Sequence, residues 1–251
     1  TQDGTARFDG KTFTPFKSTA ADGLSLGIDY GLEITSDEKN TIWIGGSEGL
    51  SRYSYITKKF THITSENYLE HGLPALYVGA ILFDKSKRLF VGTRKGLLVA
   101  QDNSLQKLTF TPFGPSEITS VNVVIEDSFG NLWVGTKENG IYILDTEGKL
   151  LRKITTANSP LTDANIVIMK ELPNNKIAIA TFGGGLTILE TQTYVGKTFK
   201  YSDSSNFTIQ NARDRVWDML YDSNGTFWIA TWDGLMTFSL ESEEFKLIPR
   251  N

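Results

Sequence analysis

The sequence contains no cysteine, only two histidines, and no run of about 18 apolar residues that could cross a membrane as a helix. The missing cysteines exclude disulfide bonds, thiolate metal sites and cysteine nucleophiles. The two histidines, His62 and His71, form no metal-ligand motif with neighbouring residues. We therefore expect no metal, no cofactor and no direct insertion of this chain into a membrane.

Blocks of basic residues are also missing. The 25 lysines and arginines are outnumbered by 29 aspartates and glutamates, which gives a net charge of −4. A protein that binds nucleic acid neutralises backbone phosphates with clustered lysine and arginine. We therefore expect no nucleic-acid partner.

What the sequence does contain is one segment repeated five times. The clearest copy reads DSFGNLWVGT, from Asp127 to Thr136. The other copies are DEKNTIWIGG (37–46), DKSKRLFVGT (84–93), LPNNKIAIAT (172–181) and DSNGTFWIAT (222–231). Their last residues are 47, 43, 45 and 50 positions apart. A fixed period of about 40–50 residues built from strands is typical of a β-propeller.

Each repeat predicts four antiparallel strands, here called a, b, c and d. In the clearest repeat they are Val121–Glu126, Asn131–Thr136, Gly140–Asp145 and Lys149–Ile154. Four-stranded sheets repeated around an axis leave only short strand edges exposed. The sequence therefore predicts an all-β fold, a β-propeller of four-stranded antiparallel blades.

The chain begins in the middle of a repeat, so we expect five whole blades and one half. The expected bounds are 1–16 for the half blade, then about 17–63, 64–113, 114–155, 156–201 and 202–251. An open half blade exposes a strand edge, which favours a fragment of a larger propeller of six or seven blades. No linker divides the sequence, so we expect a single domain over 1–251.

An aromatic residue recurs at one place in strand b, as Trp43, Phe90, Trp133 and Trp228. These four side chains are expected to be buried between blades. In the fourth whole blade Ala178 takes this place, and Leu172 replaces the aspartate of the preceding turn. A looser blade is expected there unless another large residue fills the gap.

The stretch VNVVIEDSFGNLWVGTKENGI, from Val121 to Ile141, closely resembles the two-component regulator propeller repeat. The copy at residues 165–186 departs most from it. The resemblance implies a periplasmic sensor propeller, of the kind found in Bacteroides-type hybrid two-component systems that regulate polysaccharide utilisation. It further implies a non-catalytic ligand-binding domain, a histidine kinase elsewhere in the parent protein and a possible homodimer through the full ectodomain.

In such a propeller the b–c turns and d–a loops open on one face, where a ligand would bind. The b–c turns offer a cationic group, Arg94, Lys95 and Lys137, and an aromatic group, Phe182 and Trp232 with Asp233. A sugar presents C–H faces to aromatic rings, and hydroxyl or acid groups to charged side chains. We therefore expect an oligosaccharide ligand. The alternative is that these are solvated turn residues and that Trp232 packs on a neighbouring loop.

The d–a side adds Tyr77, Arg215 and Trp217, and Asp214 joins the last two in a dense polar and aromatic cluster. The alternative is that Arg213, Asp214 and Arg215 only pair with one another.

Two other functions stay open. A protein-interaction scaffold predicts an exposed apolar patch larger than monomers usually show. A propeller lyase, lactonase or glycosidase needs convergent acids or a His–Glu pair, for which Glu70 and His71 are the only local candidates. On its own, His71 is more readily explained as a surface histidine.

Overall fold

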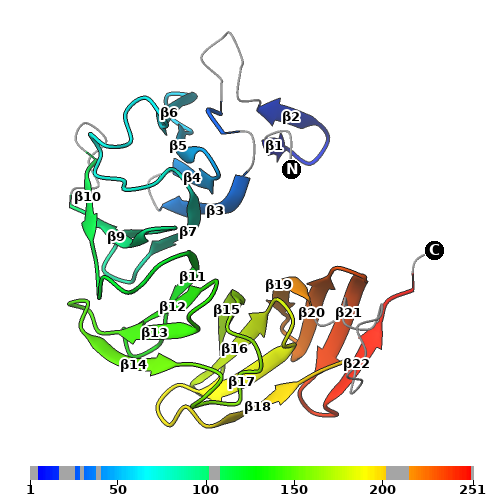
Figure 1. Cartoon of the computed structure of the whole chain (residues 1–251). Helices are drawn as coiled ribbons and strands as arrows, with labels where there is room; N and C mark the ends of the chain where they lie inside the picture. Colours follow the sequence, from blue (N-terminus) through cyan, green and yellow to red (C-terminus); the bar gives the residue numbers. More distant parts are fainter. Residues whose placement is uncertain are drawn as a thin grey trace. The chain divides into compact units, whose positions relative to one another are not determined.

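The structure, a computed structural model, describes residues 5–16, 26–28, 31–37, 41–101, 108–201 and 215–249. Within these ranges the chain forms strands and turns and no helix. Five sheets have four strands each, and one sheet has two strands (Figure 1). The all-β fold and the division into five whole blades and one half are thereby confirmed.

The strands follow one another along the chain in the order of the sheets. The half blade is β1 (Thr5–Phe8) and β2 (Phe13–Phe16). The whole blades are β3 (Gly31–Asp37), β4 (Thr41–Gly46), β5 (Gly49–Ser54) and β6 (Lys59–Ile63); β7 (Val78–Phe83), β8 (Leu89–Thr93), β9 (Gly96–Ala100) and β10 (Phe110–Pro112); β11 (Val121–Glu126), β12 (Leu132–Thr136), β13 (Ile141–Leu144) and β14 (Leu150–Ile154); β15 (Ile166–Leu172), β16 (Lys176–Thr181), β17 (Leu186–Glu190) and β18 (Gly196–Phe199); β19 (Val216–Tyr221), β20 (Thr226–Thr231), β21 (Gly234–Ser239) and β22 (Glu244–Leu247).

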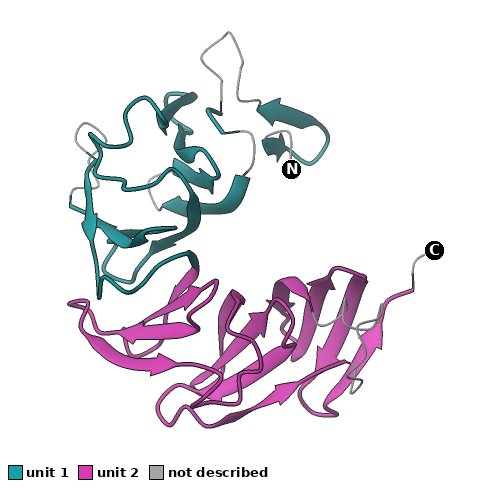
Figure 2. Cartoon of the chain, viewed as in Figure 1, with its two compact units in different colours: residues 1–121 teal, residues 122–251 magenta. Residues whose placement is uncertain are grey.

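The chain divides into two compact units, residues 1–121 and residues 122–251 (Figure 2). Unit 1 holds the half blade and the first two whole blades, and unit 2 holds the last two whole blades. The third whole blade begins with Val121 and otherwise belongs to unit 2. Every sheet falls inside the bounds expected for its blade, while the single-domain organisation stays a prediction.

The aromatic residue of strand b packs into the core of the following blade. Trp43 of β4 shares a hydrophobic cluster with Val78 and Val91 of the next sheet. Trp133 of β12 does the same with Met169 and Ile179. Neither tryptophan is more than 2% exposed. The first and third whole blades therefore each supply a large side chain that fills the interface with the next blade.

Trp228 departs from the expected burial. Phe90 is fully buried, as expected, but Trp228 is 38% exposed. Trp228 lies in the last sheet, and no later sheet covers its face among the residues that the structure describes. Because burial of this aromatic residue comes from the following blade, the repeat position alone does not bury the side chain.

A hydrogen bond ties the buried aromatic residue to the turn before strand b. Asp127 is fully buried, and its Oδ2 accepts a hydrogen bond from the indole Nε1 of Trp133 at 2.9 Å. Its Oδ1 accepts the backbone N–H groups of Phe129 and Asn131 at 2.9 and 2.8 Å. One carboxylate thus closes the turn and satisfies the polar atom of the tryptophan, which burial would otherwise penalise.

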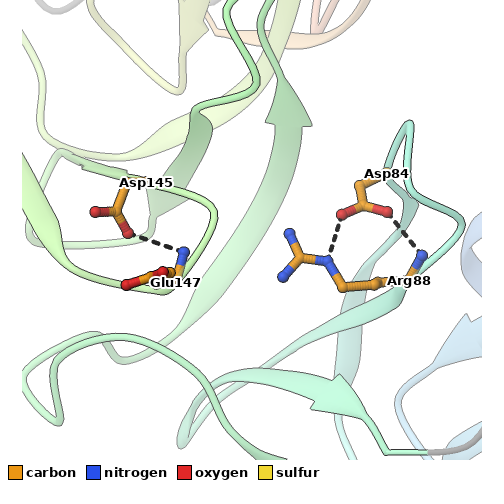
Figure 3. A network of polar contacts seen from close by, with 4 residues as sticks. All are labelled: Asp84, Arg88, Asp145 and Glu147. Carbon is orange, nitrogen blue, oxygen red and sulfur yellow. Dashed lines mark hydrogen bonds and ion pairs between the residues drawn. The ribbon is translucent and has the colours of Figure 1, made fainter.

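In the second whole blade, where phenylalanine replaces tryptophan, the equivalent aspartate accepts a hydrogen bond from a different side chain. The side chain of Phe90 has no N–H group, and Arg88 instead donates through Nε to Oδ2 of Asp84 at 2.6 Å (Figure 3). In the fourth whole blade Leu172 and Ala178 replace both partners together, and both are buried. The two departures of that repeat therefore compensate each other. Ala178 lies in a continuous cluster with Phe227 and Met219 of the next sheet.

The c–d hairpin of the third whole blade uses an equivalent aspartate turn. Oδ1 of Asp145 accepts a hydrogen bond from the backbone N–H of Glu147 at 2.9 Å (Figure 3). It also accepts one from the backbone N–H of Lys149 at 2.9 Å. Such side-chain acceptors stabilise tight turns because they bind backbone N–H groups of the turn.

Replacing Trp133 by alanine should lower the free energy of unfolding by about 3–5 kcal/mol, because a fully packed aromatic residue and its hydrogen bond are both lost. The matched control is Trp228→Ala at the same repeat position, which should cost clearly less because that ring is partly exposed. Chemical denaturation of the three proteins measures both values. Equal losses would show that the interface with the following blade is not what stabilises Trp133.

The carboxyl group of Asp222 should titrate below its usual range. The backbone N–H of Thr226, and next the indole of Trp228, bind the carboxylate and lower the pKa of Asp222 from its ordinary value of 3.8. Since the folded-state pKa is the lower one, this stabilisation is present above pH 3.8 and is lost as the pH falls through the lowered pKa. The Trp228 indole N–H resonance should shift with the same midpoint, and Asp222→Asn should abolish that transition. A midpoint at or above 3.8 would contradict the hydrogen-bonded turn.

Candidate functional site

In four blades, a β-bulge at the start of strand a changes the direction in which one side chain points. In the pair β19–β20, Val216 faces Thr231 and Asp218 faces Ala230, so Trp217 between them has no partner. The residues left over in the same way in the other blades are Leu32, Gly79 and Val167. Bulges turn a side chain out of the regular alternation of the strand. In the last blade, the residue presented in this way is a tryptophan.

Three aromatic side chains of unit 2, Phe182, Trp217 and Trp232, gather at this bulge and form what we call the aromatic cluster. The rings of Trp217 and Trp232 stack with centroids 5.5 Å apart and planes 29° apart. Phe182 meets Trp217 edge to face at 5.9 Å. Phe182 lies in the b–c turn of the fourth whole blade and Trp232 in that of the fifth. Two adjacent blades therefore build the cluster.

The backbone holds the two turns that carry these rings. The N–H of Trp232 donates to the carbonyl of Arg215 at 3.1 Å, and the N–H of Phe182 donates to the carbonyl of Asn165 at 3.0 Å. Each b–c turn is thus bonded to the segment that enters strand a of its own blade. The rings are presented by a fixed scaffold, as binding residues on loops usually are.

Charged groups border the aromatic cluster. The guanidinium of Arg215 lies over the ring of Phe182, 5.3 Å from its centroid. Asp218 follows Trp217 directly and is exposed, and Asp233 follows Trp232 and is partly buried. Arg215 therefore borders a surface whose two indoles are 52% and 57% exposed, and a carboxylate residue follows each indole in the sequence. Such a surface offers apolar stacking area with hydrogen-bonding groups of both kinds at its border.

The second whole blade, in unit 1, has a smaller group of one aromatic ring and charged side chains at the corresponding position. Arg94 lies over the ring of Tyr77 at 4.7 Å, and Lys95 beside it is exposed. The ring of Tyr77 covers the bulged Gly79, where an added Cβ would approach Cε1 of Tyr77 to 2.7 Å. Glycine at the bulge lets the preceding tyrosine occupy the space that Trp217 fills in the last blade.

The structure brings together only part of the residues expected from the sequence. Phe182, Arg215, Trp217, Trp232 and Asp233 lie close together in unit 2. Arg94, Lys95 and Tyr77 lie in unit 1, and Lys137 is an exposed turn residue of unit 2. Whether the three cations act together stays a prediction. Asp214 and Arg213, and so their pairing with Arg215, fall outside the described residues.

The alternative was that Trp232 packs on a neighbouring loop. In the structure its ring stacks on that of Trp217, in strand a of its own blade. His71 is not a fully exposed surface histidine. It is partly buried, and its Nδ1 lies 2.6 Å from the carbonyl oxygen of Leu108. Glu70 is exposed.

Two features of unit 2 escaped the sequence analysis. The bulge was not foreseen, because the unpaired residues Leu32, Gly79, Val167 and Trp217 share no residue type that would mark it. Asp218 was not considered either, because a regular strand would point it away from Trp217. In the part of the chain that the structure describes, no group of three or more histidine and acidic side chains could hold a metal ion. The described residues also include no helix suited to spanning a membrane.

Comparison with known proteins identifies the repeat. Residues 116–138 and 212–233 match the family model of the two component regulator propeller. Over 92 residues the chain is 27% identical to Histidine kinase P4 of Formosa agariphila, a match that spans 34% of this chain and 7% of that protein.

Solved structures show the same fold. The extracellular domain of the hybrid two component system BT3049 from B. thetaiotaomicron is similar with a TM-score of 0.71 and 22% identity, over 87% of this chain and 30% of that one. Virginiamycin B lyase from Staphylococcus aureus is similar with a TM-score of 0.69 and 12% identity, over 96% of this chain and 74% of that one. The chain thus spans less than a third of the sensor structure and a small part of the curated kinase.

These findings define the chain first as a β-propeller domain. More narrowly, two of its segments match the two component regulator propeller, as the sequence resemblance predicts, and its fold is like that of extracellular domains of hybrid two component systems from B. thetaiotaomicron.

The stacked pair of indoles should be visible by spectroscopy without any ligand. Coupled transitions of Trp217 and Trp232 should give an exciton couplet in the circular dichroism spectrum, since their rings are 5.5 Å apart. Trp217→Phe and Trp232→Phe should each remove the same couplet, while Trp228→Phe should leave it. A couplet that survives either of the first two changes would contradict the stacking.

Proposed function

We propose that this chain is a non-catalytic, ligand-sensing propeller of a two-component signalling protein and that its ligand is an oligosaccharide. The repeats and the fold support the sensor class. By the same likeness we place the domain outside the cytoplasm, in the periplasm, as part of an ectodomain that controls polysaccharide utilisation through a histidine kinase carried elsewhere in the protein.

The exposed, stacked pair of Trp217 and Trp232 is the observation that carries the ligand class. Large apolar side chains that are more than half exposed on a rigid scaffold are typical of binding surfaces. A pyranose ring has a flat apolar C–H face that matches an indole, and its hydroxyl groups can bond to Arg215, Asp218 and Asp233. The mixture of one cation and two carboxylates suits hydroxyl groups, which both donate and accept.

Signalling through such a domain follows from its rigidity. Blades joined by buried aromatic residues move as bodies, so a ligand acts by favouring one arrangement of the propeller against a neighbouring domain or a second protomer. The shift in that equilibrium is limited by the difference in ligand affinity between the two arrangements. A homodimer of the full ectodomain would convert such a shift into a signal.

A protein-interaction scaffold is the second candidate, favoured by one observation. Leu220 and Trp228 face each other across β19 and β20 and are 62% and 38% exposed. Leu235 faces Ala230 on β20, two residues from Trp228, and is also exposed. These residues form an apolar sheet face that a protein partner could cover.

A thermal-shift screen of the chain against neutral and acidic oligosaccharides separates the two candidates. A ligand at about 100 times its dissociation constant stabilises the folded state by about 2.7 kcal/mol, which raises the unfolding midpoint measurably. Trp217→Ala and Trp232→Ala should each remove the response to the hit.

Trp228→Ala is the matched control, since it removes an exposed tryptophan of the same blade outside the aromatic cluster. Its response to the ligand should persist. If the screen gives no hit, or if the hit acts equally on all three variants, the proposed sugar site is wrong. Loss of the response only in Trp228→Ala would instead favour binding at the apolar sheet face.

A further inference from the structure

One charged residue occupies a repeat position that is uncharged in the other four whole blades. The third residue after the glycine that opens strand c lies opposite the strand b aromatic position, and in the first whole blade this residue is Arg52, facing Trp43. Its counterparts are Val99, Ile143 and Ile188, each no more than 9% exposed, and Thr237 in the last blade. The fold itself therefore requires no charge at this position.

Arg52 is incompletely compensated. Its guanidinium lies 5.4 Å from the centroid of the Trp43 ring, and one terminal nitrogen reaches Oγ1 of Thr41 at 3.5 Å. Its Nε is buried and has no hydrogen-bond partner. Burial lowers the pKa of Arg52, and the nearby Asp37 opposes that change. A buried donor without an acceptor costs about 1–3 kcal/mol, more when charged, and structures rarely retain one without cause.

A pocket opens beside this guanidinium within unit 1. Its volume is about 30 Å³, room for a group of a few atoms, and it is open to solvent on one side. Both histidines of the chain line it together with Arg52 and Thr61, and its apolar walls are Trp43, Leu50, Ile63 and Leu108. The pocket thus combines a cation and small polar groups with a mainly hydrocarbon surface.

The loop that carries His71 is fixed against the neighbouring blade. The N–H of Phe110 donates to the carbonyl of His71 at 2.8 Å, and the N–H of Leu73 donates to the carbonyl of Tyr68 at 2.9 Å. Because a carbonyl only accepts, Nδ1 of His71 carries the proton in its bond to Leu108. Nε2 is then the ring atom that can accept a hydrogen bond, or donate one when the ring is protonated. The wall opposite Arg52 is therefore preformed.

We propose that this pocket binds the carboxylate group of a small molecule. The carboxylate supplies the acceptor that Arg52 lacks, and the remainder of the molecule extends through the open side of the pocket. A planar guanidinium suits a planar carboxylate, and one arginine that already lies near Asp37 suits one negative charge better than the two of a phosphate. The carboxylate can belong to a free organic acid or to an acidic sugar. The site is separate from the aromatic cluster and does not depend on the proposed sugar site.

The test compares the thermal unfolding of the chain in sodium propionate, sodium glucuronate, glucose and sodium chloride at matched ionic strength where ions are present. Propionate, glucuronate or both should raise the midpoint with a saturating concentration dependence, and glucose and chloride should not. A response to propionate identifies the carboxylate as sufficient. A response to glucuronate alone identifies an acidic sugar. No response to either acid, or an equal response to glucose, overturns the proposal.

Arg52→Val supplies the decisive variant, because Val99 shows that the fold accepts valine at this position. Without ligand it should unfold at the same temperature as the wild type or higher, and the rise with acid should be lost. The control Lys59→Gln removes an exposed cation of the same blade and should keep the full rise. An equal rise in Arg52→Val overturns the proposal.

A second measurement serves if Arg52→Val does not fold. Titration of the wild-type chain with the same acids should shift the Trp43 indole resonance along a saturation curve, while the Trp133 indole resonance stays in place. Equal shifts of both indoles, or a linear response without saturation, contradict a site at Arg52.

Discussion

The packing of one strand b aromatic residue into the core of the next blade is the interaction on which this structure depends. A four-stranded blade has two apolar faces and cannot bury either alone. Trp43 and Trp133 cross that boundary and fill the neighbouring core. The hydrogen bond from the Trp133 indole to Asp127 then couples the interface to the a–b turn, so the turn and the packing stabilise each other.

This scaffold determines where a binding surface can form. Since strands b and c are largely buried in the first four whole blades, turns and the bulge at the start of strand a are the main places for variable, exposed side chains. The aromatic cluster uses both places: Phe182 and Trp232 come from b–c turns and Trp217 from the bulge. Sequence changes at these positions leave the blade core untouched, which lets a propeller vary its ligand without losing its fold.

The period of the sequence was sufficient to predict the sheets, because four of the five copies share the aspartate turn and the aromatic residue and all five have a glycine before strand c. Strand a of the clearest blade was predicted with its observed bounds, Val121–Glu126. The exposure of Trp228 could not be predicted from its repeat position, since burial there is a property of the following blade. Nor could the meeting of Trp217 with Phe182, because a bulge changes the direction of a side chain without a distinct sequence signal.

Departures from the repeat are informative when they are compared with their surroundings. Phe90 departs from tryptophan, and Arg88 supplies the missing donor to Asp84. Leu172 and Ala178 depart together, so that no polar atom is left without a partner. Arg52 departs alone: its blade keeps Trp43, and its buried Nε has no acceptor. A departure that its neighbours compensate is explained by the fold, whereas one that leaves a buried charge incompletely satisfied points to a group from outside the chain.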